Sequence, residues 1–238
     1  MHVAEIIEHQ RHIVYDAAIK DPMMVLQLPA ATEESAQRAA AGRGQTWIVS
    51  HVTGAVVLRH YRRGGVIARI VSDRYLWLGW QHTRPYREWQ LLKILYDAGL
   101  PVPQPVAAQA YREGLSYTAD LATRYLENSQ PLSHFLLQQS TDWQVLGQML
   151  RRFHRAGVWH ADLNAHNILC TAQGPYLIDF DRGRLLAAEK DQITGWMQAN
   201  LARLLRSLRK LKRQTPGFYF EETRDWPQLL AAYHAAER

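Results

Sequence analysis

The chain has 238 residues, with 28 Lys and Arg against 22 Asp and Glu, and a formal net charge of +6. Hydrophobic residues make up 47% and charged residues 21%, a balance that excludes a disordered chain and predicts a folded protein. No run approaches the ~18 apolar residues of a membrane-spanning helix, and the single cysteine, Cys170, excludes an intrachain disulfide and fits a reducing cytosol.

The first half of the chain has the pattern of a small sheet with one helix. Strands are expected at 47–49, at 55–58, after the glycine pair at 64–65, and at 117–126. Between residues 84 and 98 apolar residues recur at helical spacing, and Gly99 ends the pattern. This half therefore combines short strands with a single amphipathic helix.

The second half is mainly helical. Helices are expected at 132–137, 142–156 and 195–213, and a last one after Trp226. Two short apolar runs, at 167–170 and 176–180, interrupt the helices and are typical of strands. The order of elements is therefore strands with one helix, a strand that crosses over, and then a helical half.

The most informative stretch is His-Ala-Asp-Leu-Asn-Ala-His-Asn-Ile-Leu at 160–169, which is followed by Asp-Phe-Asp at 179–181. Phosphoryl transfer from ATP needs a carboxylate that orients the acceptor hydroxyl and takes its proton, and oxygen ligands that hold Mg²⁺ on the phosphates. Asp162 and Asn167, five residues apart on a loop, can face one cleft and do these two jobs. Asp179, at the end of a buried strand, supplies a second metal ligand.

This pattern resembles the catalytic and metal-binding loops of the protein-kinase-like fold. Within that fold the chain resembles the bacterial lipopolysaccharide kinases, from about Gly42 to the C-terminus. The catalytic loops are common to the whole superfamily, whereas the Arg-rich segments narrow the resemblance to kinases of the sugar 3-deoxy-D-manno-octulosonic acid (Kdo). The stretches that carry the resemblance are 57–65, 160–169, 176–183 and 200–208.

The resemblance implies a two-lobed α+β fold, with a small antiparallel-sheet lobe at 1–127 and a mainly helical lobe at 128–238 that holds the catalytic and metal loops. It implies that Asp162 is the catalytic base, and that Asn167 and Asp179 are ligands of Mg²⁺. His160 would support the loop from beneath. The alternative is a polar surface turn followed by an ordinary strand, and the number of matches in the right order and spacing argues against it.

The first lobe should hold the phosphates of ATP. Gly42 and Gly44 fit the position of a kinase glycine loop, where backbone N–H groups approach phosphate oxygens, although Trp47 replaces the third glycine. Arg59 stands where the superfamily usually has lysine, and its guanidinium can bind phosphates as a fork. Glu88 is its expected partner. The alternatives are a plain hairpin for the glycines, a surface strand residue for Arg59 and a solvated helix residue for Glu88.

The segment that follows the metal loop argues against a protein substrate. Only residues 182–195 separate it from the next helix, and they contain no Ala-Pro-Glu signature. A protein kinase needs a longer segment to dock a peptide. The sequence therefore predicts a kinase of a small molecule or a lipid.

Positive charge is concentrated in the expected helix at 200–213, which contains no acidic residue. Its cations are Arg203, Arg206, Arg209, Lys210, Lys212 and Arg213. Each cation close to an anionic membrane surface contributes about 1 kcal/mol of attraction, so this helix is expected to hold the protein to the inner membrane. The alternative is that its leucines pack into the lobe and its cations form a solvated face.

By the resemblance, the expected reaction is phosphorylation of the 4-hydroxyl of Kdo on a lipid A precursor, Kdo-lipid IVA, in lipopolysaccharide core biosynthesis. ATP and Mg²⁺ would be the cofactors, and the protein would be peripheral on the cytoplasmic face of the bacterial inner membrane. One alternative is another sugar kinase of the same fold, acting on a lipopolysaccharide heptose or an aminoglycoside-like sugar. The other is a non-catalytic kinase-like module that binds anionic lipid or nucleic acid.

Some residues argue against the non-catalytic binding module, and others leave it open. A binding module has no need of Asp162, Asn167 and Asp179 together, whereas Arg59 and the missing third glycine leave that alternative open. No nucleic-acid partner is expected, because tryptophans such as Trp89 lie among apolar helix positions and are predicted to be core. The 11 His show no metal-ligand spacing, so no zinc site is expected.

Overall fold

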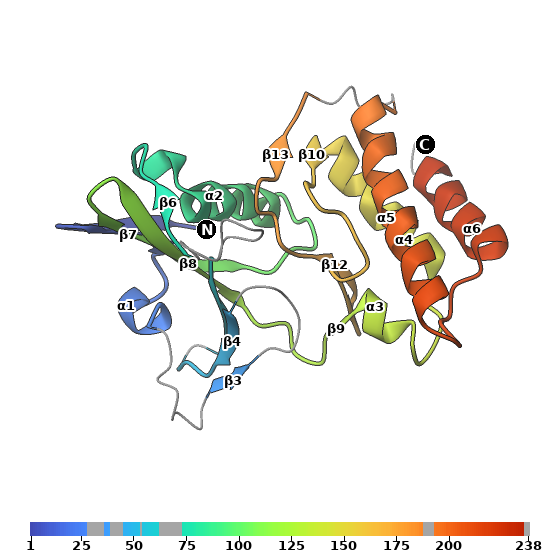
Figure 1. Cartoon of the computed structure of the whole chain (residues 1–238), viewed down its shortest axis with the longest axis horizontal. Helices are drawn as coiled ribbons and strands as arrows, with labels where there is room; N and C mark the ends of the chain where they lie inside the picture. The colour runs from blue at the N-terminus through green and yellow to red at the C-terminus, as the bar shows by residue number, and fades with distance from the viewer. Residues whose placement is uncertain (28–35, 39–44, 53, 62–72, 188–192, 236–238) are drawn as a thin grey trace. The chain divides into compact units, whose positions relative to one another are not determined.

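The computed structural model describes all residues except 28–35, 39–44, 53, 62–72, 188–192 and 236–238. It divides into two compact units, shown in Figure 1: residues 1–98 with 103–125, and residues 99–102 with 126–238. Residues 99–102 belong to the second unit, and the backbone N–H of Leu177 donates to the carbonyl oxygen of Pro101 at 2.9 Å. Each unit is described separately below.

The described strands of the first unit form one antiparallel sheet. They are β1 (Val3–Glu8), β2 (Arg11–Asp16), β3 (Ala36–Arg38), β4 (Gln45–Val49), β5 (Val56–His60), β6 (Tyr75–Leu76), β7 (Pro105–Glu113) and β8 (Ser116–Arg124). The order across the sheet is β1-β2-β7-β8-β5-β4-β3, and β6 pairs with the end of β8. The sheet therefore places β5 directly beside β8.

Helices cover the central strands of this sheet. α2 (Arg84–Asp97) packs on β7 and β8, as Figure 1 shows, and the short α1 (Pro22–Val25) packs on β7. Residues 105–110 of β7 are consequently all buried, without the alternation of a half-exposed strand. α2 presents Trp89, Leu92 and Leu95 to the core, which agrees with the apolar spacing in the sequence.

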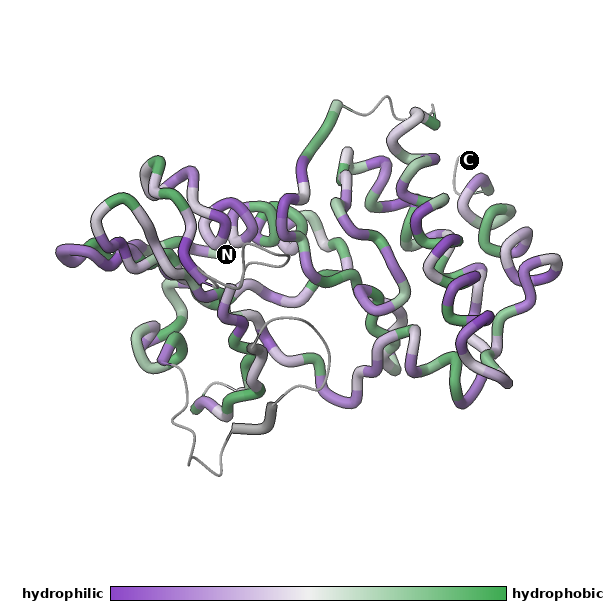
Figure 2. Tube along the Cα trace, viewed as in Figure 1, coloured by the Kyte–Doolittle hydropathy of each residue, from purple (hydrophilic) through white to green (hydrophobic). Residues whose placement is uncertain are grey.

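The second unit is mainly helical. Its elements are α3 (Leu132–Phe135), α4 (Trp143–Arg155), α5 (Gly195–Gln214) and α6 (Glu222–Ala235), with short strands β9 (Gln130–Pro131), β10 (Val158–Trp159), β11 (Ile168–Thr171), β12 (Gly174–Leu177) and β13 (Arg184–Leu185). The green, apolar parts of the helices in Figure 2 alternate with purple, polar parts. α4 and α6 pack closely at Gly147, because a Cβ there would lie 2.2 Å from the carbonyl oxygen of Leu229.

The expected α+β class is confirmed, with an antiparallel sheet in the first unit and helices in the second. The structure adds the β1–β2 hairpin and β7, neither of which was expected from the sequence. β7 gives little strand signal because it contains several alanines. The expected run at 176–180 ends earlier, at Leu177. α6 begins at Glu222, ahead of Trp226, and the N–H of Glu221 donates to the Asp225 carboxylate at 2.7 Å.

None of the helices in the part of the chain that the structure describes has both the length and the apolar composition needed to span a bilayer. The strand expected after the glycine pair at 64–65 lies outside the described residues.

His154 is a buried titratable group in the core of the second unit. Its Nδ1 lies 2.7 Å from the Tyr233 hydroxyl, and the ring packs edge-on against Trp196. Burial, helped by the charge of Arg151, lowers the pKa of His154 to about 4. The imidazole is therefore neutral in the folded protein at neutral pH.

This pKa predicts a loss of stability in weak acid. Between about pH 6.5 and 4 the unfolded chain binds a proton at His154 that the folded chain does not, so the free energy of unfolding falls as the pH falls, by up to about 3 kcal/mol. Urea denaturation across this range should show a steeper pH dependence for the wild type than for His154→Gln. Equal pH dependence of the two proteins would contradict the prediction.

Candidate active site

The loop between β10 and β11 is supported by a buried histidine. His160 Nδ1 accepts the backbone N–H of Asp162 at 3.1 Å, and its Nε2 lies 3.0 Å from the carbonyl oxygen of Ile178. Because Nδ1 accepts a hydrogen bond, the ring proton is on Nε2 and donates to that carbonyl. Burial also lowers the pKa of His160, which favours the neutral ring. The ring thus joins the loop to the segment that follows β12.

α5 holds the same loop from another side. Asn200 Oδ1 accepts the backbone N–H of His160 at 3.1 Å, and Asn200 Nδ2 donates to the His160 carbonyl oxygen at 2.9 Å. Two turns further on, Ser207 Oγ accepts the backbone N–H of Ala165 at 3.2 Å. Asn200 is buried, so its amide satisfies both backbone groups of a residue that water does not reach.

Asp162 projects from this supported loop into solvent. Its side chain is 63% exposed, and Oδ1 lies 3.4 Å from Nη1 of Arg203 on α5. Its backbone carbonyl oxygen accepts hydrogen bonds from Asn167 Nδ2 at 2.9 Å and from Asn164 Nδ2 at 3.1 Å. The backbone is therefore fixed while the carboxylate remains accessible to a substrate.

The β11–β12 hairpin brings the two expected metal ligands to one end. Ile168 pairs with Leu177, and the N–H of Ile178 donates to the carbonyl oxygen of Asn167 at 3.0 Å. Asp179 follows directly, with a φ of 63°, a left-handed conformation that turns the chain and that few non-glycine residues adopt.

These two residues fit a magnesium ion. The Asn167 amide donates through Nδ2, which leaves its Oδ1 for a cation, and Asp179 adds a carboxylate. Mg²⁺ prefers such oxygen ligands and takes one or two carboxylates together with substrate phosphates. The described residues contain no cluster of three or more His, Cys, Asp or Glu with metal-site geometry.

In the first unit, Arg59 of β5 and Glu88 of α2 form a salt bridge. Arg59 Nη2 lies 2.5 Å from Glu88 Oε2, which also accepts the Tyr61 hydroxyl at 2.5 Å. The Glu88 side chain is 2% exposed, whereas that of Arg59 is 22% exposed. The carboxylate is thus enclosed, and the guanidinium it holds keeps contact with solvent.

The structure brings some of the expected residues together and leaves others outside its description. Arg59 and Glu88 are in contact. Asp162 and Asn167 lie on one loop, where Asn167 Nδ2 donates to the carbonyl oxygen of Asp162. Gly42 and Gly44 lie outside the described residues.

Sequence reasoning assigned no role to three contributors, Tyr61, Asn200 and Ser207. Positions 200, 203 and 207 have the spacing of one helix face, and this is the signal that could have grouped two of them with Arg203.

Cys170 takes no part in this chemistry. It is a free thiol, and burial raises its pKa to about 11. A thiol with that pKa is protonated at neutral pH and is a poor nucleophile. It lies in β11, where it serves as a small side chain of the strand.

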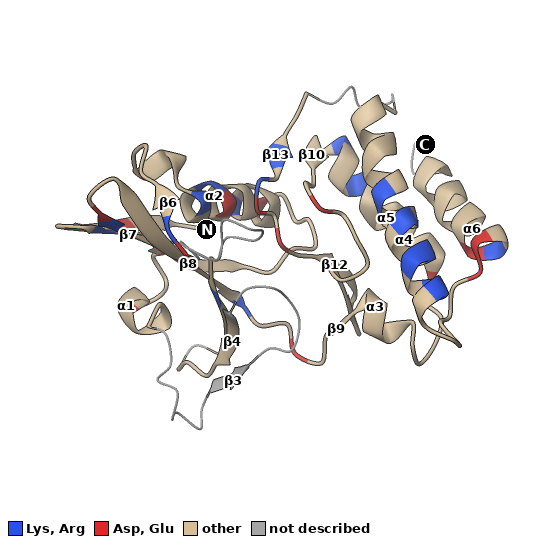
Figure 3. Cartoon of the chain, in the orientation of Figure 1, with Lys and Arg blue, Asp and Glu red and all other residues tan. Residues whose placement is uncertain are grey.

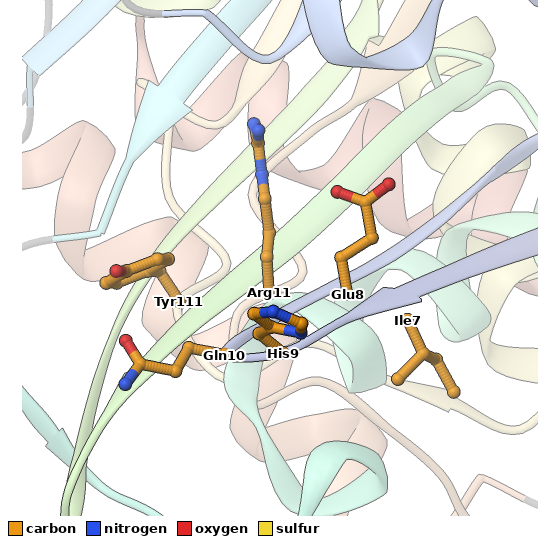
Figure 4. Close-up of a pocket in the computed structure, with 6 residues that line it drawn as sticks. All are labelled: Ile7, Glu8, His9, Gln10, Arg11 and Tyr111. Carbon is orange, nitrogen blue, oxygen red and sulfur yellow. The ribbon is translucent and has the colours of Figure 1, made fainter.

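The first unit also has a surface hollow that does not include Arg59 or Glu88. Figure 4 shows it at the turn between β1 and β2, bounded by polar side chains of that turn and by Tyr111 of β7. Of the expected site residues that the structure describes, none lines it. Apart from Tyr111, its residues belong to the β1–β2 hairpin at one edge of the sheet, and they do not include the phosphate-binding candidates of β5 and α2.

Comparisons with known proteins give the relatives of this chain. Residues 29–233 match the model of the family described as Lipopolysaccharide kinase (Kdo/WaaP). Proteins named 3-deoxy-D-manno-octulosonic acid kinase are 46% identical over 198 residues in Xanthomonas oryzae pv. oryzae (strain PXO99A), 45% over 200 in Xylella fastidiosa (strain M12) and 43% over 198 in Stenotrophomonas maltophilia (strain K279a). Each match covers 82% of this chain and 77% of the relative.

Among solved structures, the chain is similar to "WaaP in complex with acyl carrier protein" with a TM-score of 0.53 and 18% identity. The match covers 85% of this chain and 79% of that one. At this identity the similarity concerns the fold alone, and it confirms the expected kinase-like fold.

Proposed function

Because the chain belongs to the lipopolysaccharide kinase (Kdo/WaaP) family, we propose that it transfers the γ-phosphoryl group of ATP to the 4-hydroxyl of Kdo on a lipid A precursor. Membership makes it a phosphotransferase with an alcohol group as acceptor. The observation that supports the proposed chemistry best is the exposed carboxylate of Asp162 on a loop whose backbone is fixed by His160 and Asn200.

In this proposal Asp162 accepts a hydrogen bond from the acceptor hydroxyl and takes its proton as the oxygen bonds to the γ-phosphorus. The bond between the γ-phosphorus and the β–γ bridging oxygen breaks, and ADP leaves. Asn167 and Asp179 would hold Mg²⁺, which when bound neutralises charge on the phosphate oxygens. His160 and Asn200 keep the base in position and exchange no proton with the substrate.

In the first unit the proposed role of Arg59 is to bind the phosphates of ATP. A guanidinium offers two parallel N–H donors to phosphate oxygens. Its contact with Glu88 limits its freedom before ATP arrives, which reduces the entropy lost on binding. Backbone donation from Gly42 and Gly44 stays a prediction from the sequence. We also propose that residues 1–127 and 128–238 act as the two functional lobes.

The proposed acceptor is anchored in lipid, and this bears on where the protein works. We propose that it acts as a peripheral protein at the cytoplasmic face of the inner membrane, where ATP and the lipid acceptor are both available. The names of the relatives favour Kdo as the acceptor sugar over a heptose.

An acceptor panel tests this proposal. Purified protein is incubated with Mg²⁺-ATP and, separately, Kdo-lipid IVA, a heptosylated lipid A and a generic protein substrate, and the products are analysed by mass spectrometry. Added phosphate is expected on the Kdo lipid alone. Transfer only to the heptosylated lipid would keep the reaction and overturn the sugar. No transfer to any acceptor by a protein that still binds ATP would overturn the kinase function.

A further inference from the structure

α5 carries two groups of cations with different surroundings. Figure 3 shows Lys and Arg along this helix and acidic residues at the start of α6. Arg209 binds Glu222 through Nε and Nη2, at 2.6 and 2.5 Å, and Lys212 Nζ lies 2.5 Å from Glu221 Oε1. The charge on this side of α5 is therefore neutralised by the start of α6.

The other group is a stripe of four exposed residues, which we call the α5 cation stripe: Arg203, Arg206, Lys210 and Arg213. Their spacing of three, four and three residues places them within about 80° of one another around the helix. Arg203 contacts Asp162. For the other three, no acidic group of the described chain lies within salt-bridge distance.

The stripe runs beside the catalytic loop. Asn200, Arg203 and Ser207 all contact the segment 160–165, so this edge of α5 faces the loop. The first cation of the stripe is therefore at the catalytic carboxylate, and the others extend away from it.

The repulsion between the like charges of the stripe, and the length of the stripe, both indicate that it binds a ligand. Like charges three or four residues apart destabilise a helix, and α5 contains no acidic residue that would offset them. From Arg203 to Arg213 the helix rises by about 15 Å. A lipid A precursor carries phosphate groups on its disaccharide, next to the sugar that is to be phosphorylated. A stripe of this length can bind such a phosphate while the acceptor hydroxyl lies at Asp162.

We propose that the α5 cation stripe binds a phosphate group of the lipid-linked acceptor and thereby aligns the acceptor hydroxyl with Asp162. This inference rests on the proposed function and adds a recognition site to it. Guanidinium groups bind phosphate through paired hydrogen bonds, which suits a stripe rich in arginine. The specific acceptor is favoured over bulk anionic phospholipid, because the stripe begins at the catalytic carboxylate.

The test compares two double variants with the same change in net charge. Arg206→Gln with Lys210→Gln removes two cations of the stripe, and Lys20→Gln with Arg87→Gln removes two exposed cations of the first unit. For each protein, kcat/KM is measured with Kdo-lipid IVA and with the same lipid after removal of its disaccharide phosphates. The ratio of the two values reports how strongly the enzyme prefers the phosphorylated acceptor.

We expect the stripe variant to lower this ratio about 10- to 100-fold, the effect of losing hydrogen bonds to a charged group, and the control variant to leave it unchanged. An unchanged ratio in the stripe variant would overturn the inference. So would a stripe variant that loses binding to phosphatidylglycerol vesicles while the ratio stays the same, because the stripe would then be a general membrane contact.

Binding of the two lipids in detergent micelles, measured without ATP, separates the inference from the proposed function. If the wild type transfers no phosphate but binds the phosphorylated lipid more tightly than the stripe variant does, the stripe is retained and the kinase function fails. If the wild type and the stripe variant bind the phosphorylated lipid with equal affinity, and neither prefers it over the dephosphorylated lipid, the inference is overturned whatever the activity.

Discussion

Replacing Asp162 by Asn is expected to lower kcat about 10²- to 10⁴-fold, the usual contribution of a positioned general base. An amide cannot take the proton of the acceptor hydroxyl. The side chain is 63% exposed and its ion pair with Arg203 is at the surface, so the change costs little stability. The N–H and carbonyl of residue 162 keep their partners, His160 and Asn167. Steady-state kinetics with saturating ATP and acceptor measure the effect.

The control for this variant is Glu8→Gln, which removes an exposed carboxylate from β1 in the first unit. It should have the wild-type kcat. ATP binding and the urea midpoint of Asp162→Asn should match those of the wild type, which ties the loss to the chemical step. An Asp162→Asn protein with wild-type kcat would show that another group takes the proton.

Replacing Glu88 by Ala is expected to destabilise the protein by about 3–5 kcal/mol, the range for breaking a buried ion pair. The carboxylate is 2% exposed and serves both Arg59 and the Tyr61 hydroxyl. Without it the mostly buried Arg59 guanidinium and the Tyr61 hydroxyl both lose a charged acceptor, and the remaining contact between them, Arg59 Nη2 to the Tyr61 hydroxyl at 3.0 Å, carries no opposite charge. Urea denaturation of the two proteins measures the difference in free energy of unfolding.

The chain offers a matched control in Glu113→Ala. Glu113 also pairs with an arginine, Arg74, but both side chains are roughly half exposed, and surface pairs contribute at most about 1 kcal/mol. Similar losses for Glu88→Ala and Glu113→Ala would contradict the importance assigned to burial.

Arg59→Lys separates stability from function at this salt bridge. Lysine keeps the charge next to Glu88 but lacks the fork of N–H donors. We expect the KM for ATP to rise with a smaller loss of stability than in Glu88→Ala. An unchanged KM for ATP would remove Arg59 from the proposed phosphate site.

Much of the fold could be predicted where the sequence carries a strong local signal. α2, α4 and α5 follow the helical spacing of their apolar residues, and β5 and β8 follow β-prone runs. β7 could not be found in this way, because its alanines favour no strand. Its conformation comes from pairing with β2 and β8 and from burial under α2.

In the candidate site, too, some residues could be predicted from the sequence and others could not. Asp162, Asn167 and Asp179 are recognisable because their chemistry requires fixed spacings along the chain. Asn200 supports the loop from 40 residues away, and no local pattern indicates that its amide meets the backbone of His160. Tertiary packing also determines which cations of α5 are neutralised, because the acidic partners of Arg209 and Lys212 come from the start of α6.

The position of the transferred phosphate is the most direct test of the proposed function. The protein is incubated with ATP labelled in the γ-phosphate, Mg²⁺ and Kdo-lipid IVA, and the intact product is fragmented by tandem mass spectrometry, which breaks the ketosidic bond of Kdo. Label is expected on the Kdo fragment, located at its 4-hydroxyl, and none on the remaining lipid. Label on the lipid fragment, or no transfer at all, would contradict the proposed function.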